Sequence, residues 1–205
     1  MRFILFAALL AALPMSAGAT EEPPHSVLVE DGKFEIRQYE PTIVAEIEVT
    51  GDMQRAGNSG FRPLAGYIFG DNMSRAKIDM TAPVTRVKSE KIEMTSPVTR
   101  TQSDKDTWTV AFVMPKEWTI ATLPAPNDPS VEIRKVPGEL MATIRFSGRP
   151  GEVEFSKREA ELRAWMSSQG YVDVGPARFA GYNAPFVPGA FRRNEVMIPI
   201  TLATS

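Results

Sequence analysis

The sequence predicts an α+β fold in which one unit, two strands, a helix and further strands, occurs twice with pseudo-two-fold symmetry. The first observation is an internal echo, since Glu35-Ile36-Arg37 returns as Glu132-Ile133-Arg134 after 97 residues. At the same separation, Ala45, Ile47 and Thr50-Gly51 return as Ala142, Ile144 and Ser147-Gly148. A looser echo relates Gly66-Tyr67-Ile68 to Gly170-Tyr171-Val172 and Phe112–Pro115 to Val196–Pro199. No linker separates the halves, so we expect a single domain.

Two stretches with helical periodicity, one in each half, are the second observation. In the first, an apolar stripe steps by three and four residues through Met53, Ala56, Gly60, Leu64, Tyr67 and Ile68. Gly70 is placed to end this helix. The second helix runs from Glu152 to Gln169, with Pro150 before it and Gly170 after it. Its expected buried side consists of Val153, Ala160, Leu162, Trp165 and Met166.

Short segments typical of β-strands are the third observation. They are Phe34–Gln38, Ile43–Thr50, Trp108–Met114, Val131–Val136, Leu140–Phe146 and Asn194–Thr201. Between them, Leu123–Pro129 contains three prolines, which predicts an extended or turned loop.

A ten-residue segment also occurs twice in succession, as Lys77–Arg86 and Lys91–Arg100, with eight of ten positions identical. Apolar and polar residues alternate in both copies, which predicts the two strands of one hairpin. Pro83 and Pro97 each remove a backbone donor and belong at an edge, a bulge or a strand end. The simplest interpretation puts Met and Val in the core. The alternative is that the Met-bearing faces also line a ligand groove.

Residues 1–19 have the features of a secretory signal peptide, namely Arg2, an apolar run from Phe3 to Leu13 and Ala17-Gly18-Ala19 as the cleavage site. The run is too short to span a membrane. We therefore expect a mature chain in the bacterial periplasm or outside the cell, with no stable membrane anchor. Residues 20–26 are predicted to be a flexible lead-in, and residues 27–205 the folded domain.

Composition excludes several function classes. The chain has no cysteine, so its core must hold it without disulfides. The formal net charge of −2 gives no basic face for nucleic acid. No heptad pattern or exposed apolar helix predicts assembly, so we expect a monomer.

The sequence also predicts a protein without a catalytic or metal site. His25 is the single histidine and lies in the lead-in, so neither a Ser-His-Asp triad nor a zinc site has its residues. Gly57–Gly60 lacks the lysine of a phosphate-binding loop. Asp79 and Glu93 occupy matching places in the tandem repeat and are expected to face solvent.

Several ordered segments together resemble the SOUL heme-binding-protein family, from about Glu35 to Pro199. They are Tyr67–Gly70 with Asn72, Lys77–Val84, Phe112–Pro115, Leu123–Asp128, Val136-Pro137, Phe146–Gly148, Tyr182–Phe186 and Arg192–Val196. The resemblance implies a distorted antiparallel β-barrel or sheet flanked by two helices. It also implies that heme or a related tetrapyrrole binds, without catalysis, in a shallow apolar groove between the first helix and a late loop.

Carried over by residue, the resemblance implies a cofactor-binding set of Phe61, Arg62, Leu64, Ala65, Ile68, Tyr182, Phe186, Val187 and Arg192. A tetrapyrrole needs an apolar slot and cations for its propionates. Gly66 stands where heme-binding relatives carry a propionate-binding lysine, and Arg62, Arg192 or Arg193 is the expected substitute. Candidate axial ligands are Met80, Met94, Tyr67 and Tyr182, and the sequence selects none of them. The alternative function is binding of another apolar small molecule, or an envelope interaction module, on the same fold without heme.

Overall fold

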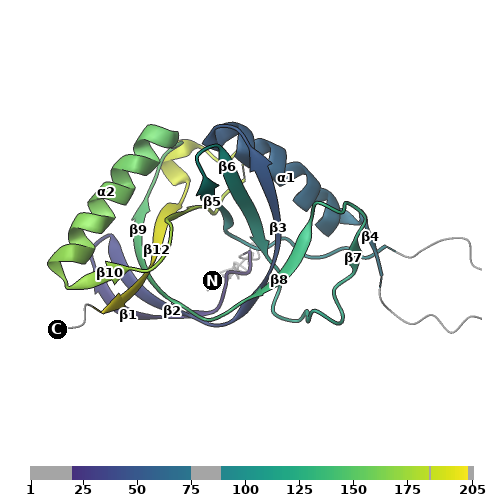
Figure 1. Ribbon diagram of the computed structural model, residues 1–205, viewed down its shortest axis with the longest axis horizontal. Coiled ribbons are helices and arrows are strands. Elements are labelled where there is room, and N and C mark those ends of the chain that lie inside the picture. Colours follow the sequence, from purple (N-terminus) through teal and green to yellow (C-terminus); the bar gives the residue numbers. More distant parts are fainter. Residues whose placement is uncertain (1–19, 75–88, 185, 203–205) are drawn as a thin grey trace, which may run out of the picture.

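The computed structural model describes residues 20–74, 89–184 and 186–202. An antiparallel sheet of ten strands curls into a half-barrel, and two helices lie on its outer side (Figure 1). The predicted α+β class and the curled sheet flanked by two helices are therefore confirmed. Within the described ranges, no helix combines the length and the hydropathy needed to cross a membrane.

The strands and helices have the following bounds. The strands are β1 (His25–Asp31), β2 (Phe34–Tyr39), β3 (Thr42–Thr50), β4 (Asn72–Met73), β5 (Val98–Asp104), β6 (Thr107–Val113), β7 (Ala125–Pro126), β8 (Glu132–Val136), β9 (Leu140–Phe146), β10 (Tyr171–Asp173), β11 (Arg178–Gly181) and β12 (Asn194–Leu202). The helices are α1 (Met53–Phe69), α2 (Glu152–Ser168) and a short 3-10 turn, η1 (Gly189–Phe191). The six predicted strands correspond to β2, β3, β6, β8, β9 and β12.

The order of the strands shows how the two halves interlock. Along the main sheet it is β1-β2-β9-β12-β11-β5-β6-β3-β8, with β10 beside β12. About the boundary between β11 and β5, the strands β2, β9, β12 and β11 mirror β8, β3, β6 and β5. Each half therefore lends one strand, β2 or β8, to the sheet of the other half, and neither half forms a separate domain. The predicted duplication is confirmed.

Two glycines show the same symmetry at the level of the backbone. Gly51 and Gly148 follow β3 and β9 with φ of 127° and 121°, a conformation that favours glycine. Gly51 N donates to Asp106 O at 2.9 Å, and Gly148 N donates to Gly189 O at 3.0 Å. The looser echo between Gly66 and Gly170 is wrong, because Gly66 lies within α1 whereas Gly170 follows the end of α2.

Helix α1 packs on β3 and β6 through the predicted apolar stripe, all six residues of which are buried. The Asp52 side chain caps its first turn by accepting from the backbone N–H groups of Gln54 and Arg55. A Cβ added to Gly60 would lie 2.6 Å from a methyl carbon of Val110. Glycine at this position therefore lets the helix approach β6 closely.

The predicted buried side of α2 is only partly right. Leu162 and Met166 are buried, whereas Val153 and Ala160 are exposed and Phe155 takes the inward position. Each wrong residue lies two positions from a correct one, about 200° around a helix, and so faces the opposite way. Trp165 is half-buried and stacks on Phe34 at 4.9 Å between ring centroids.

The predicted hairpin of the tandem repeat fails where it can be examined. The whole first copy, Lys77–Arg86, lies outside the described residues. In the second copy, residues 91–97 form no strand, and β5 begins only at Val98. Ile92 N donates to Ile68 O at the end of α1, and Ser96 N donates to Glu21 O. The segment bonds to these two places instead of a partner strand, and Glu93 is exposed as expected.

The segment predicted as a flexible lead-in contacts both halves of the sheet. The Glu21 side chain accepts from Lys116 N at 2.9 Å, and Glu22 pairs with Arg193 at 2.8 Å. β1 begins at His25, two residues before the predicted start of the domain.

Candidate ligand-binding site

Strand register brings α1 and the loop between β11 and β12, residues 182–193, to the same end of the sheet. Phe112 of β6 pairs with Val98 of β5, which in turn pairs with Gly181 at the end of β11. Phe61 of α1 contacts Phe112, with 5.3 Å between ring centroids. Neighbouring strands lie about 4.8 Å apart. Phe112 is two strands away from Gly181, so it lies about 10 Å from the start of the late loop.

The late loop holds aromatic rings out in solvent. Phe186 is 84% exposed and Phe191 is 78% exposed, whereas Val187 is half-buried. The loop is nevertheless braced, because Tyr182 N donates to Arg193 O at 3.2 Å and η1 is hydrogen-bonded to the β9–α2 connection. Exposed aromatic rings on a braced loop are candidates for contact with a ligand or a partner. Phe191 was not predicted from the sequence, although it lies only five residues after Phe186.

The predicted residues of α1 divide into two groups. Phe61, at 38% exposed, and Arg62 are at the surface, and Ala65 is half-buried. Leu64 and Ile68 are fully buried in the core between α1, β3 and β6. They therefore support the helix from beneath and do not form part of its outer surface.

Tyr182 is turned away from Phe61, to the inner face of the half-barrel. Its hydroxyl donates to Glu195 Oε2 at 2.6 Å, and the Arg193 guanidinium lies over its ring at 3.8 Å. Glu195 also forms a two-pronged ion pair with Arg37, and both side chains are buried. The structure thus places Tyr182 in a buried polar network and not beside the helix.

The network shifts the ionisation of its members. Burial raises the pKa of Tyr182 far above its usual value, and the negative charge of Glu195 adds to this effect. Burial also opposes ionisation of Glu195, but hydrogen bonds and positive charge from Arg37 outweigh it and lower the pKa of the carboxyl. Glu195 is therefore an ionised anchor at neutral pH.

The cations predicted to receive a propionate differ in their availability. Arg193 is paired with Glu22 and Glu195, and Arg192 Nε donates to Val187 O at 2.8 Å, which braces the loop. Arg62 is exposed to solvent. A Cβ added at Gly66 would lie 2.7 Å from Asp71 Oδ2, so a lysine there would have to displace Asp71.

Two of the four candidate axial ligands, Tyr67 and Tyr182, are hydrogen-bonded elsewhere. The Tyr67 hydroxyl donates to Pro124 O at 3.0 Å in the interior. Met94 is half-buried, and Met80 lies outside the described residues. His25 packs its ring against Tyr39 at 4.8 Å. Across the described part of the chain, no group of three or more His, Cys, Asp or Glu side chains could hold a metal ion.

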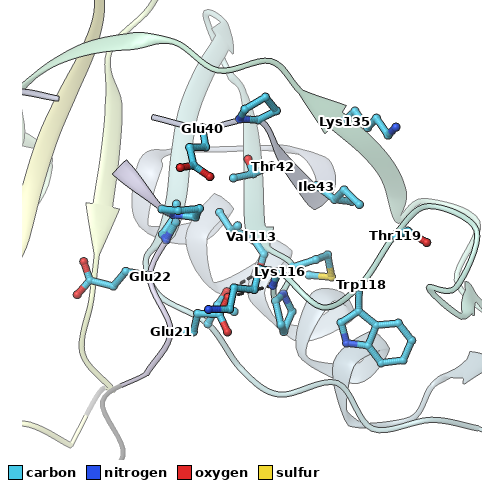
Figure 2. A pocket seen from close by; sticks show the side chains of 16 residues that line it. Glu21, Glu22, Glu40, Thr42, Ile43, Val113, Lys116, Trp118, Thr119 and Lys135 are labelled. Atoms are coloured by element: carbon cyan, nitrogen blue, oxygen red, sulfur yellow. Dashed lines mark hydrogen bonds between the residues drawn. The ribbon is translucent and has the colours of Figure 1, made fainter. Parts of the chain in front are cut away.

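A separate pocket of about 430 Å³ lies beneath residues 21–24, at the ends of β3 and β6. Ile43, Met114 and Trp118 supply apolar walls, and Lys116 and Lys135 also line it. Figure 2 shows Glu22 and Trp118 on opposite sides. This pocket was not predicted from the sequence, because its lining comes from segments far apart in the chain that only the fold brings together.

Comparison with known proteins decides the family. The model of the SOUL heme-binding protein family matches residues 20–199. The chain belongs to the SOUL heme-binding protein family. Among its SOUL relatives, human heme-binding protein 2 is 30% identical over 196 residues, which cover 92% of this chain and 90% of the relative. The predicted family is thus confirmed, and heme or tetrapyrrole binding is the function associated with the family.

Solved structures with the same fold have much lower identity. The C-terminal domain of EcmrR aligns with a TM-score of 0.60 at 11% identity, over 83% of this chain and 98% of that domain. A hydrolase from Listeria innocua aligns with a TM-score of 0.56 at 12% identity, over 85% of this chain and 94% of that one. These likenesses establish the shared fold of the SOUL chain and carry no function to it.

Proposed function

We propose that this SOUL protein is an exported, non-catalytic binder of heme or a related tetrapyrrole. The ligand lies on the outer face of the sheet between Phe61 of α1 and the late loop. One observation carries the proposal: exposed Phe61, Phe186 and Phe191 belong to two elements that strand register brings to one end of the sheet. Family membership supports a tetrapyrrole as the ligand.

Apolar burial supplies most of the affinity in this proposal. Aromatic rings pack well against a flat macrocycle, and apolar surface removed from water contributes about 25 cal/mol per Å². The bracing of the loop reduces the conformational entropy lost on binding. With one histidine and no cysteine in the sequence, iron ligation contributes little.

A hemin titration followed by absorbance tests the proposal. The protein should give a saturable Soret shift at one equivalent. Phe186→Asp and Phe61→Asp should each weaken binding by about ten-fold or more, because a buried carboxylate opposes an apolar ligand. Val174→Asp is the matched control, since Val174 is 62% exposed and follows β10 near the opposite end of β12.

Circular dichroism should show that each variant is folded. Phe186 is the more decisive position, because it is far more exposed than Phe61 and its replacement threatens the core less. The absence of a saturable shift from folded protein would refute tetrapyrrole binding. An equal loss in Val174→Asp would refute the location.

The pocket beneath residues 21–24 supports a second candidate function, binding of a smaller apolar molecule. Its volume of about 430 Å³ is in the range of sites for drug-sized ligands. Ile43→Trp would fill it. Binding of the fluorescent probe anilinonaphthalene sulfonate should fall in this variant while hemin binding stays unchanged. Unchanged probe binding would remove this candidate.

A further inference from the structure

We propose that Arg100 is the residue that binds a carboxylate of the tetrapyrrole, on the floor between α1 and α2. This inference rests on the proposed function and adds to it a specific anion-binding contact. Arg100 was not among the cations predicted from the sequence.

Strand geometry places Arg100 beside the proposed ligand face. Arg100 follows Val98 by two residues in β5, so both side chains are on the helix-covered face, about 7 Å apart along the strand. Val98 pairs with Phe112 of β6 on one side and with Gly181, where the late loop starts, on the other. A ligand that lies over Val98 therefore has Arg100 as the next side chain along the same face of β5.

Both helices contribute to the surroundings of Arg100. A Cβ added at Gly57 of α1 would lie 3.1 Å from both Cδ and Nη1 of Arg100, so glycine makes room for the guanidinium. Gly57 is four residues before Phe61 and thus on the same side of α1. From α2, the ring centroid of Phe155 lies 5.4 Å from the guanidinium carbon. Phe179 pairs with Arg100 from β11.

Within the described residues, Arg100 differs from the other buried or half-buried arginines in donating no hydrogen bond to a carboxylate or a carbonyl. Every other buried or half-buried arginine in the described ranges donates a hydrogen bond to a carboxylate or a carbonyl; they are Arg37, Arg158, Arg163, Arg178, Arg192 and Arg193. No such bond from Arg100 to a described residue exists, and it is half-buried. Burial lowers the pKa of Arg100, and no negative charge among the described residues opposes that shift.

An arginine in this state favours an anionic ligand. Guanidinium stays charged at neutral pH, and partial desolvation without a counter-ion is costly. A carboxylate can accept two parallel hydrogen bonds from its planar fork. Because the neighbours of Arg100 include Gly57 and two phenylalanines, the best-matched ligand carries its carboxylate on an apolar ring system. The solvated Arg62 offers a weaker contact of this kind.

The test compares hemin with its dimethyl ester, which has the same macrocycle without free carboxylates. Wild-type protein should bind hemin more tightly than the ester. Arg100→Met should weaken hemin binding by about ten-fold or more and leave ester binding within about two-fold. Arg145→Met, an exposed arginine on β9, should change neither affinity.

The outcomes distinguish failure of the proposed function from failure of the role proposed for Arg100. Wild-type protein that binds neither ligand refutes the proposed function itself. If wild-type protein binds hemin and Arg100→Met binds it equally well, the role of Arg100 is refuted. An equal loss for hemin and ester would also refute it, since Arg100 would then only support the fold. If Arg100→Met does not fold, Arg100→Lys keeps the charge without the fork and should bind hemin with intermediate affinity. Wild-type affinity in that variant would count against paired hydrogen bonds to a carboxylate.

Discussion

Replacing Glu195 with alanine should destabilise the protein by about 3–5 kcal/mol. The Glu195 side chain is 0% exposed, and that of Arg37, its ion-pair partner, is 2% exposed. The carboxylate accepts from Arg37 at 2.8 and 3.0 Å, from Arg193 at 2.9 Å and from Tyr182 at 2.6 Å. Its removal leaves a buried guanidinium with Glu35 as its one remaining carboxylate, at 2.6 Å from Nε. That remaining contact favours the lower end of the range.

Urea unfolding monitored by circular dichroism measures this cost, and the fold supplies a matched control. Arg134 stands 97 residues after Arg37 in the internal echo and forms the same two-pronged pair with Glu46, but it is 52% exposed. Glu46→Ala should therefore cost at most about 1 kcal/mol. Arg37→Met combined with Glu195→Leu should recover much of the stability lost in Glu195→Ala, because no charge stays buried alone. If Glu195→Ala costs no more than Glu46→Ala, the argument from burial is wrong.

Three further changes test the same network and the packing of α1. The pKa of Glu195 is lowered in the folded state, so its contribution is present above the unfolded value of about 4.3 and is lost as pH falls through the folded pKa. The free energies of unfolding of wild type and Glu195→Gln should therefore converge as the pH falls through that range. The pKa of Tyr182 is raised, so its contribution to stability is full below about pH 10 and is lost as pH rises further. Tyr182→Phe should lower the free energy of unfolding at neutral pH by about 1 kcal/mol. The same variant should lose less stability than wild type at alkaline pH. Gly60→Ala places a carbon 2.6 Å from Val110 and should cost about 1–3 kcal/mol in a thermal melt, whereas an unchanged melting temperature would mean that α1 moves away from β6 freely.

Local patterns in the sequence predicted most of the fold. The α1 stripe from Met53 to Ile68 is buried as expected, because its spacing reports directly which side of a helix faces the core. The echo at 97 residues predicted the duplication. Gly51 and Gly148 are part of that echo, and both have a positive φ, which favours glycine. The α2 pattern was weaker, since Val153 and Phe155 both offered an apolar residue to the first turn.

Contacts between distant segments were beyond prediction from the pattern. Arg37 and Glu195 are 158 positions apart, and nothing local to either indicates the other. Arg100 is the last residue of the second decapeptide, and nothing in that pattern marks it as a binding residue. Its special position depends on Gly57 and Phe155, which only the packing of both helices brings to it. The strand predicted over residues 91–97 is absent for a related reason, since alternation of apolar and polar residues alone does not specify a partner strand.

Departures from the internal symmetry give an independent argument for the location of the proposed site. Between β5 and β6 the chain turns through residues 105–106 alone, whereas the equivalent connection between β11 and β12 is residues 182–193. The path from the end of the helix to the central strand is also unequal, residues 70–97 after α1 against 169–177 after α2. The long path of the first half ends at Val98, and the long loop of the second half starts after Gly181, which pairs with Val98. The scaffold needs neither addition, because its other half does without each. The two additions meet at the Val98–Gly181 pair, next to Phe112, which lies beneath Phe61. A ligand site added to a duplicated fold would be expected at such a place.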